Sequence, residues 1–365
     1  MGSKKKWDRN EIKERLRNTP IYQQRTYRSM SSAINVPKST LHSMKTNENN
    51  IIIPHSNSIK PILTAQNRMQ RLRYAVEHTF EIDGEVYYDD FYDTVFLDEK
   101  WFFISEKELL MYLTEGEEPP DRFCKHKSHI LKVMFLCAVA RPRFDEEGNE
   151  IFDGKIGIWP FVEEVTAVRN SKNREAGEIE LKNVPVTKEL YVQYVCEKVV
   201  PKIKEKFLAI DPRKKDIKVQ HDNAKTHHHE QDPDWAAVSK AGNWNMTLAA
   251  QPPNSPDKNI LDLGFFRALQ SNQWNHGFAS NTAELIAQVE RAFLVYPSKK
   301  LACTFVTLQS VLDETLKNNG RNNYKIPHMN KAKMMKEGTL PLSLKMSDDA
   351  RVAFDNLWEQ EEGWI

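Results

Sequence analysis

The chain has 365 residues, of which 40% are hydrophobic and 10% aromatic, and this length leaves room for a small domain beside a larger one. No apolar run is long enough to cross a membrane and none follows the N-terminal lysine cluster, so we expect neither a membrane span nor a secretory signal. The four cysteines are scattered without a Cys-x-x-Cys pair, which argues against a structural zinc site and a disulfide framework and favours reduced thiols in a cytosolic or nuclear protein.

The net charge of +1 conceals an uneven distribution along the chain. Residues 1–75 contain 15 Lys and Arg against 4 Asp and Glu, a net of +11, whereas the remaining residues contain 37 against 47, a net of −10. Lys and Arg side chains that neutralise phosphates supply most of the non-specific affinity of proteins for nucleic acids. We therefore expect the basic N-terminal segment to bind nucleic acid.

Residues 1–46 are predicted to form a small helical domain. Helical spacing of apolar residues and proline breaks predict helices over 8–17, 26–34 and 38–45. A helix, a short turn and a second helix form a helix-turn-helix, whose second helix enters the major groove of DNA. The predicted DNA contacts are Arg25, Arg28, Lys38, Ser39, Thr40, His42, Ser43 and Lys45. A generic three-helix domain with a solvated basic face is the alternative.

Residues 47–80 are predicted to be a linker followed by a basic helix over 64–77. Arg68 and Arg71 share one side of this helix, where they can face phosphates, an acidic surface or solvent. The apolar residues Ile51, Ile52 and Ile53 are either a partner-binding strip or part of a buried linker.

Residues 81–340 are predicted to form an α/β domain. Strands are expected over 94–97, 131–140, 216–221 and 246–250, with hairpin candidates over 101–105 and 109–113. Helices are expected over 188–207, kinked near Pro201, and over 262–272, 282–294 and 305–318. This order predicts a ribonuclease-H-like catalytic domain, a mixed sheet flanked by helices, with an insertion near 141–186. Residues 341–365 are expected to form a C-terminal helical tail.

Three aspartates are the candidate catalytic and metal-ligating residues. Asp98 and Asp222 each follow an apolar β run, and Asp262 opens an amphipathic stretch. Carboxylates without cysteine suit Mg²⁺ or Mn²⁺, and two such ions can activate the attacking oxygen and stabilise the leaving oxygen of a phosphodiester. Each aspartate also has a structural alternative: a turn residue at Asp98, an Asx turn at Asp222 and a helix N-terminal acid at Asp262.

Two neighbouring features compete with this assignment. Asp257 lies close to Asp262, but Ser255-Pro256-Asp257 is typical of a turn that Asp257 stabilises. The run His227-His228-His229 cannot converge on one ion from a helix, so we expect exposed histidines there, with His227 as a possible accessory residue near Asp222.

Three sequence blocks resemble the catalytic motifs of mariner-superfamily DNA transposases. They are Asp98-Glu99-Lys100-Trp101-Phe102, His221-Asp222-Asn223-Ala224-Lys225-Thr226-His227, and Gln251-Pro252-Pro253-Asn254-Ser255-Pro256-Asp257 followed by Leu261-Asp262-Leu263. The 39 residues between Asp222 and Asp262 and the third acid being Asp resemble the plant-type branch. Segments 154–161 and 322–328 also resemble that branch, and the similarity covers roughly residues 20–340.

The resemblance implies a nuclear cut-and-paste transposase. Asp98, Asp222 and Asp262 would bind two Mg²⁺ or Mn²⁺ ions, and the enzyme would bind terminal inverted repeats, cut both strands and join 3′-hydroxyls to TA sites. Members of the family act as homodimers and usually carry two helix-turn-helix units. This chain has room for one, which by the resemblance corresponds to the second. A transposase-derived DNA-binding protein without cleavage activity and a structure-specific nuclease of the same fold are the alternatives.

Overall fold

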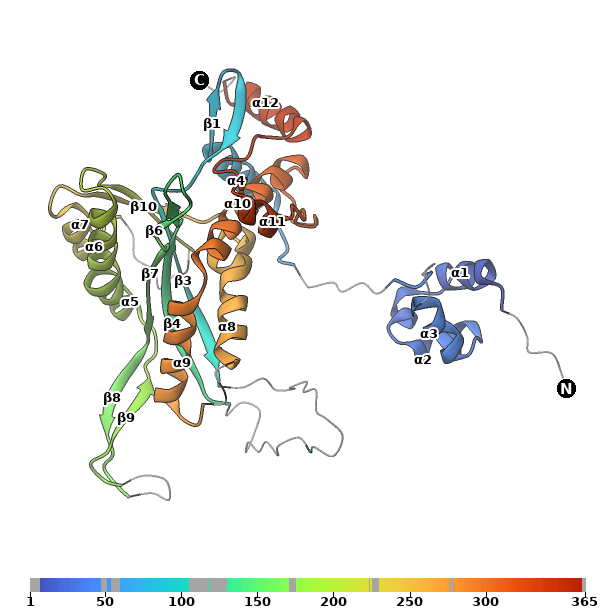
Figure 1. Cartoon of the computed structure of the whole chain (residues 1–365), viewed down its shortest axis with the longest axis horizontal. Helices are drawn as coiled ribbons and strands as arrows, with labels where there is room; N and C mark the ends of the chain where they lie inside the picture. The colour runs from blue at the N-terminus through green and yellow to red at the C-terminus, as the bar shows by residue number, and fades with distance from the viewer. Residues whose placement is uncertain are drawn as a thin grey trace. The chain divides into compact units, whose positions relative to one another are not determined.

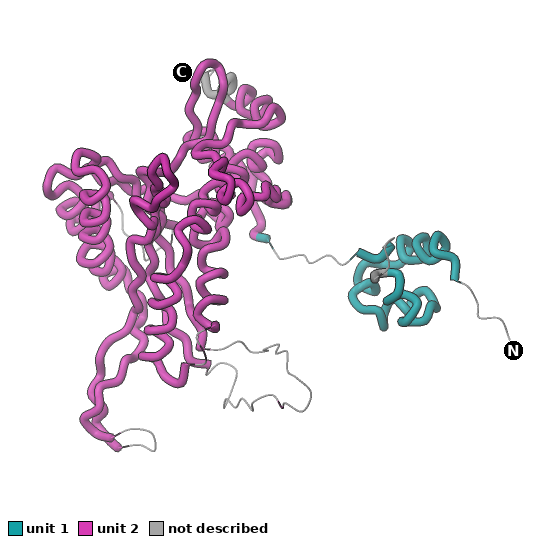
Figure 2. Tube along the Cα trace, viewed as in Figure 1, with its two compact units in different colours: residues 1–60 teal, residues 61–365 magenta. Residues whose placement is uncertain are grey.

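The computed structural model divides the chain into two compact units, Met1–Lys60 and Pro61–Ile365 (Figure 2). The residues that the structure describes are 7–46, 51–53, 60–104, 118, 130–170, 175–222, 224, 230–275, 277 and 279–362. Among these residues, no helix combines the length and the apolar character needed to cross a membrane.

The first unit is helical. Its elements are α1 (Arg9–Arg17), η1 (Ile21–Gln24), α2 (Tyr27–Ile34) and α3 (Lys38–Thr46). The Thr26 side chain accepts a hydrogen bond from the Ser29 backbone and fixes the start of α2, while Asn35 in the left-handed region (φ 54°) ends it. The buried core consists of Ile12, Leu16, Met30, Ile34, Val36, Leu41 and Met44.

The linker isoleucines separate into two groups. Ile51 and Ile52 pack against the core of the first unit, whereas the Ile53 side chain is 63% exposed. Two of the three residues are thus held within this unit, as in the buried-linker alternative.

The second unit contains a five-stranded mixed sheet of order β11-β10-β3-β4-β7 (Figure 1). Its strands are β3 (Thr94–Phe103), β4 (Lys132–Ala140), β7 (Lys155–Pro160), β10 (Asp216–His221) and β11 (Asn245–Ala250). Strands β11, β10 and β3 run parallel, and β3, β4 and β7 pair antiparallel. Three two-stranded sheets accompany it: β1 (Thr79–Ile82) with β2 (Glu85–Tyr88), β5 (Arg143–Phe144) with β6 (Glu150–Phe152), and β8 (Val162–Thr166) with β9 (Ile179–Asn183).

Helices cover both faces of the central sheet (Figure 1). One hydrophobic core joins the sheet to α5 (Lys188–Tyr194), the π-helical turn Val195–Val199, α6 (Val200–Ile210) and α7 (Pro233–Lys240). The other core joins it to the π-helical segment Leu261–Phe265, α8 (Phe266–Trp274), α9 (Thr282–Val295) and α10 (Ser298–Lys317). Helices α4 (Ala65–Glu77) and α12 (Asp348–Glu362) also contribute to this second core, and the short α11 (Lys331–Lys336) contacts α10. Side chains of one strand alternate between the two cores, because successive residues of a strand point to opposite faces.

Three predictions about this unit need correction. The strand over 94–97 and the hairpin candidate over 101–105 are one continuous strand, β3, because β4 pairs with it up to Phe103. The predicted insertion near 141–186 contains β7, an integral edge strand whose Ile156 and Ile158 are buried. Helix α10 begins at Ser298, before the predicted start at 305. The hairpin candidate over 109–113 lies outside the described residues.

The long helix predicted over 188–207 is interrupted just before Pro201. Proline lacks an N–H group and its ring clashes with the carbonyl four residues earlier, so an α-helix cannot continue through it unchanged. The chain responds with the π-helical turn Val195–Val199 between α5 and α6.

Candidate active site

Asp98 and Asp222 lie where the parallel pairing of β3 and β10 ends. The last paired residues are Phe96 and Gln220, and each aspartate lies two residues further along its strand direction. Asp98 therefore shares a strand face with Phe96, a residue of the core beneath α8, α9 and α10. Contrary to the prediction, Asp98 is in the middle of its strand, because β3 continues along β4 after leaving β10.

Asp262 approaches from the helical side. It lies in the π-helical segment Leu261–Phe265, which departs from helical geometry at Gly264 (φ 173°, ψ −24°) before α8 begins. Leu261 and Phe265 are fully buried and anchor this segment in the core, whereas Asp262 is exposed.

The three carboxylates influence one another's pKa values. Burial and then the negative charges of Asp262, Glu99 and Asp222 raise the pKa of Asp98 to about 8. Although Asp262 reaches solvent, the residues around its carboxyl group partly desolvate it and raise its pKa; Lys100 opposes this increase and Asp222 adds to it. Every pair of the three aspartates thus interacts, as expected for like charges brought together in a partly desolvated site.

The structural alternatives for these aspartates also have support. Asp222 Oδ1 accepts a hydrogen bond from the Ala224 backbone at 2.9 Å, which is an Asx turn, and Asp262 lies in the first turn of its helical segment. Within the described ranges, no group of three Asp, Glu, His or Cys side chains converges closely enough to enclose a metal ion.

The three carboxylates nevertheless have the chemistry that a divalent cation requires. Three carboxylates supply oxygen ligands, which hard cations prefer, and like charges held together are what a cation would neutralise. The buried Asn259 amide donates to Asp98 Oδ2 at 2.9 Å, and the Glu99 backbone donates to Oδ1 at 2.8 Å. These bonds orient a carboxylate in the way that outer-shell partners orient metal ligands.

Sequence reasoning missed two residues of this site. Lys100 shares the strand face of Asp98 and lowers the pKa of Asp262, and Asn259 holds Asp98 from three residues before Asp262. The alternation of β3 could have indicated Lys100. No sequence signal marks Asn259, because its contact with Asp98 depends on the tertiary fold.

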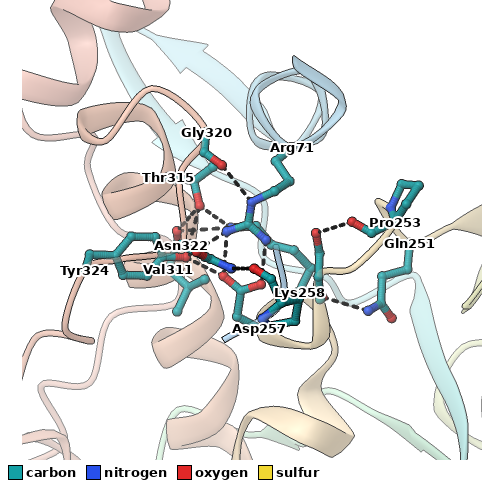
Figure 3. A network of polar contacts seen from close by, with 12 residues as sticks. Arg71, Gln251, Pro253, Asp257, Lys258, Val311, Thr315, Gly320, Asn322 and Tyr324 are labelled. Carbon is teal, nitrogen blue, oxygen red and sulfur yellow. Dashed lines mark hydrogen bonds and ion pairs between the residues drawn. The ribbon is translucent and has the colours of Figure 1, made fainter. Parts of the chain in front are cut away.

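Arg71 and Asp257 form a buried ion pair beside the site. The guanidinium donates through Nη1 to Asp257 Oδ1 at 2.6 Å and through Nη2 to Oδ2 at 2.7 Å (Figure 3). Burial favours the neutral acid, but Arg71 and Lys258 outweigh this effect and hold the pKa of Asp257 far below its usual range. Of the three environments considered for Arg71, the structure shows an acidic partner within the protein.

The predicted DNA contacts lie on the first unit. Arg25, Arg28, Lys38, Ser39, His42 and Ser43 are exposed, and Thr40 is half-buried. Leu41 and Met44 of α3 are buried, so α3 turns one face inward and leaves this polar face outward. The side chain of Lys45 and all of His227 lie outside the described residues.

Comparisons with known proteins define the fold. No protein-family model matches the chain, and no curated protein matches it. A pre-cleavage Mos1 transpososome aligns with 89% of this chain and 82% of its own, with a TM-score of 0.54 and 14% identity. With the same coverage and 13% identity, the Mos1 transposase paired-end complex with left transposon end has a TM-score of 0.53, and the Mos1 mariner paired-end complex with Mn has 0.51. This likeness confirms the predicted fold class, a ribonuclease-H-like α/β domain preceded by a helical domain.

Proposed function

We propose that this chain is a cut-and-paste DNA transposase of the mariner superfamily, of the plant-type branch. The observation that carries the proposal is the set of three mutually interacting carboxylates: Asp98 on β3, Asp222 just after β10 and Asp262 on the adjoining helical segment of a ribonuclease-H-like domain. The fold shared with the Mos1 transposase paired-end complex with left transposon end and with the pre-cleavage Mos1 transpososome supports the same activity.

The chain's own residues would divide the work between the two units. The exposed face of α3, with Lys38, Ser39 and His42, would bind the terminal inverted repeats, because basic and short polar side chains suit phosphates and base edges. Asp98, Asp222 and Asp262 would hold two Mg²⁺ or Mn²⁺ ions, which when bound activate the attacking oxygen and stabilise the leaving oxygen. Asn259 would keep Asp98 in one orientation.

The reaction would cut both DNA strands at each element end and then join the 3′-hydroxyls to TA target sites. A homodimer would hold the two ends together, and the enzyme would act in the nucleus. The division into helix-turn-helix (1–46), linker and basic helix (47–80), catalytic domain (81–340) and C-terminal tail (341–365) stays part of this proposal. So does the accessory role of His227.

The test is cleavage of a plasmid that carries the genomic flanks of this reading frame, with Mg²⁺ or Mn²⁺, beside an Asp98→Asn variant. We expect cuts at the flank ends that the variant abolishes, with DNA binding retained by gel shift, because the lost carboxylate is outside the first unit. Binding without any cuts would favour a transposase-derived DNA-binding protein. Equal cutting of plasmids without the flanks would favour a structure-specific nuclease.

A further inference from the structure

The 3-10 helical turn Pro256–Lys258 and the residue after it, Asn259, connect three elements; residues 257–259 are called the turn below. The connections are made by the three consecutive side chains of the turn. Asp257 pairs with Arg71 of α4, and Lys258 Nζ donates to the Val311 carbonyl of α10 at 3.1 Å (Figure 3). Asn259 Nδ2 donates to Asp98 Oδ2 of β3 at 2.9 Å. The turn therefore joins helices α4 and α10 to the Asp98 carboxylate.

The backbone of the same turn contacts the segments that carry the other two acids. The Lys258 carbonyl accepts from Gln220 Nε2 at 2.9 Å, two residues before Asp222. The Asn259 carbonyl accepts from the Leu263 backbone at 2.8 Å, the residue after Asp262. Asp98 thus accepts a hydrogen bond from the turn directly, and Asp222 and Asp262 each lie within two residues of a group that donates to its backbone.

The arrangement is almost completely buried. The side chains of Arg71 and Lys258 are fully buried and Asn259 is 1% exposed. Arg71 Nε also donates to the Gly320 carbonyl at 2.9 Å, and the Tyr324 hydroxyl donates to Asp257. Apolar side chains of similar volume often stabilise a core as well as a buried ion pair does, whereas breaking such a pair is costly. Removing Arg71 alone would therefore leave the Asp257 carboxylate without its charged partner in a largely buried place.

We propose that Asn259 is a positioning residue for Asp98. Arg71, by pairing with Asp257, keeps the turn where the Asn259 amide can donate to the Asp98 carboxylate. The inference rests on the proposed function in that it takes the three aspartates as ligands of a divalent cation. The Asn259 amide fixes the rotation of the Asp98 carboxylate, and a ligand held in one orientation loses less entropy on binding a cation.

The experiment measures Mn²⁺ binding to the full-length protein without DNA, from the electron paramagnetic resonance signal of free Mn²⁺. The variants are Asn259→Ala and Arg71→Met, and Asp98→Asn defines the background. Arg141→Met is the matched control, because Arg141 is also a buried arginine. Its guanidinium donates to the Asp90 and Leu342 carbonyls at 2.8 and 2.7 Å, away from residues 257–259. We expect Mn²⁺ binding about 10–100-fold weaker in Asn259→Ala and Arg71→Met and unchanged in Arg141→Met.

Circular dichroism at the assay temperature establishes which variants are folded. If Arg71→Met does not fold, Arg71→Lys keeps the charge but loses the two-pronged contact, and it should show the same weakening. Wild-type Mn²⁺ affinity in folded Asn259→Ala overturns the proposal, as does an equal loss in folded Arg141→Met.

Mn²⁺ binding and DNA cleavage separate this inference from the proposed function. If Mn²⁺ binding follows the expected pattern but the wild type cuts no DNA, the positioning role stands and the transposase activity fails. If the wild type binds Mn²⁺ no better than Asp98→Asn, both fail, because the aspartates are then not ligands.

Discussion

Asp98 and Asp257 show how neighbours decide the charge of a carboxylate in this protein. Burial favours the protonated form of both. Asp98 adjoins other acids, so its pKa rises to about 8, whereas Asp257 faces Arg71 and its pKa falls far below the usual range. Asp98 is therefore suited to bind a cation, whereas Asp257 is already paired with the Arg71 guanidinium.

His78 provides a test of stability against pH. It packs against Tyr74 and Phe91, with ring centroids 4.3 and 5.0 Å away, and burial lowers its pKa to about 4. Between about pH 6.5 and 4 the unfolded chain binds a proton at His78 that the folded protein does not. The His78 contribution to the free energy of unfolding therefore falls as the pH falls, by up to about 3 kcal/mol, whereas the raised pKa of Asp98 contributes in the opposite direction. Urea denaturation at pH 7 and pH 4.5, compared between the wild type and a variant without His78, measures the His78 contribution.

The control for His78 is His78→Phe, which cannot bind the proton. On going from pH 7 to pH 4.5, the change in its free energy of unfolding should be less unfavourable than that of the wild type, because Asp98 and the other carboxylates contribute equally to both proteins. Equal losses would contradict the buried neutral histidine.

Helix α4 is held in the fold by the loop that follows α10. Gly320 has φ +74°, and a Cβ added there would lie 2.3 Å from the Arg68 carbonyl oxygen. The same glycine accepts the hydrogen bond from Arg71 Nε. The close approach of two backbones thus places the guanidinium opposite Asp257, so element packing determines the residue contact.

Gly320→Ala should lower the free energy of unfolding by more than about 2 kcal/mol, because it adds a collision to an unfavourable φ. Gly338→Ala is the matched control, with φ +69° and nothing within 4 Å of the added Cβ. It should cost only the backbone term of about 1 kcal/mol. Chemical denaturation compares the two variants, and equal costs would refute the close approach.

The elements with strong local signals were predictable from the sequence. Thr26 and Thr64 mark the starts of α2 and α4 as N-caps, and the apolar run over 131–140 gave β4. β7 was missed because it is short and lies in a charged, glycine-containing stretch, so only its pairing with β4 defines it. The three aspartates were identifiable from their places along the chain, but Asn259 and the Arg71–Asp257 pair depend on contacts across the fold.

The charge of the whole molecule follows its division into units. The excess of Lys and Arg is in residues 1–75, most of which form the first unit, and the second unit is acidic. A basic domain can therefore supply the electrostatic affinity for DNA while an acidic catalytic domain adds little to it.

Lys38→Ala should weaken DNA binding and reduce the slope of log affinity against log salt by about 1, because one phosphate contact is lost. Lys333→Ala, which removes an exposed charge from α11 in the second unit, should leave both unchanged. Fluorescence anisotropy with a flank duplex at several salt concentrations measures the slopes. An unchanged slope in Lys38→Ala would remove α3 from the DNA contact surface.

The sheet order also has a consequence for synthesis of the chain. One edge of β3 pairs with β10 in the finished sheet. The ribosome synthesises β10 only after β4, β7 and the helices α5 and α6. Pairing between such distant segments is slow, since loop-closure entropy opposes it until many contacts form. Asp98 therefore cannot meet Asp222 before about three fifths of the protein has been made, or Asp262 before almost three quarters. An incomplete or truncated product would carry the basic domain without an assembled acidic group, and would compete for DNA without cutting it.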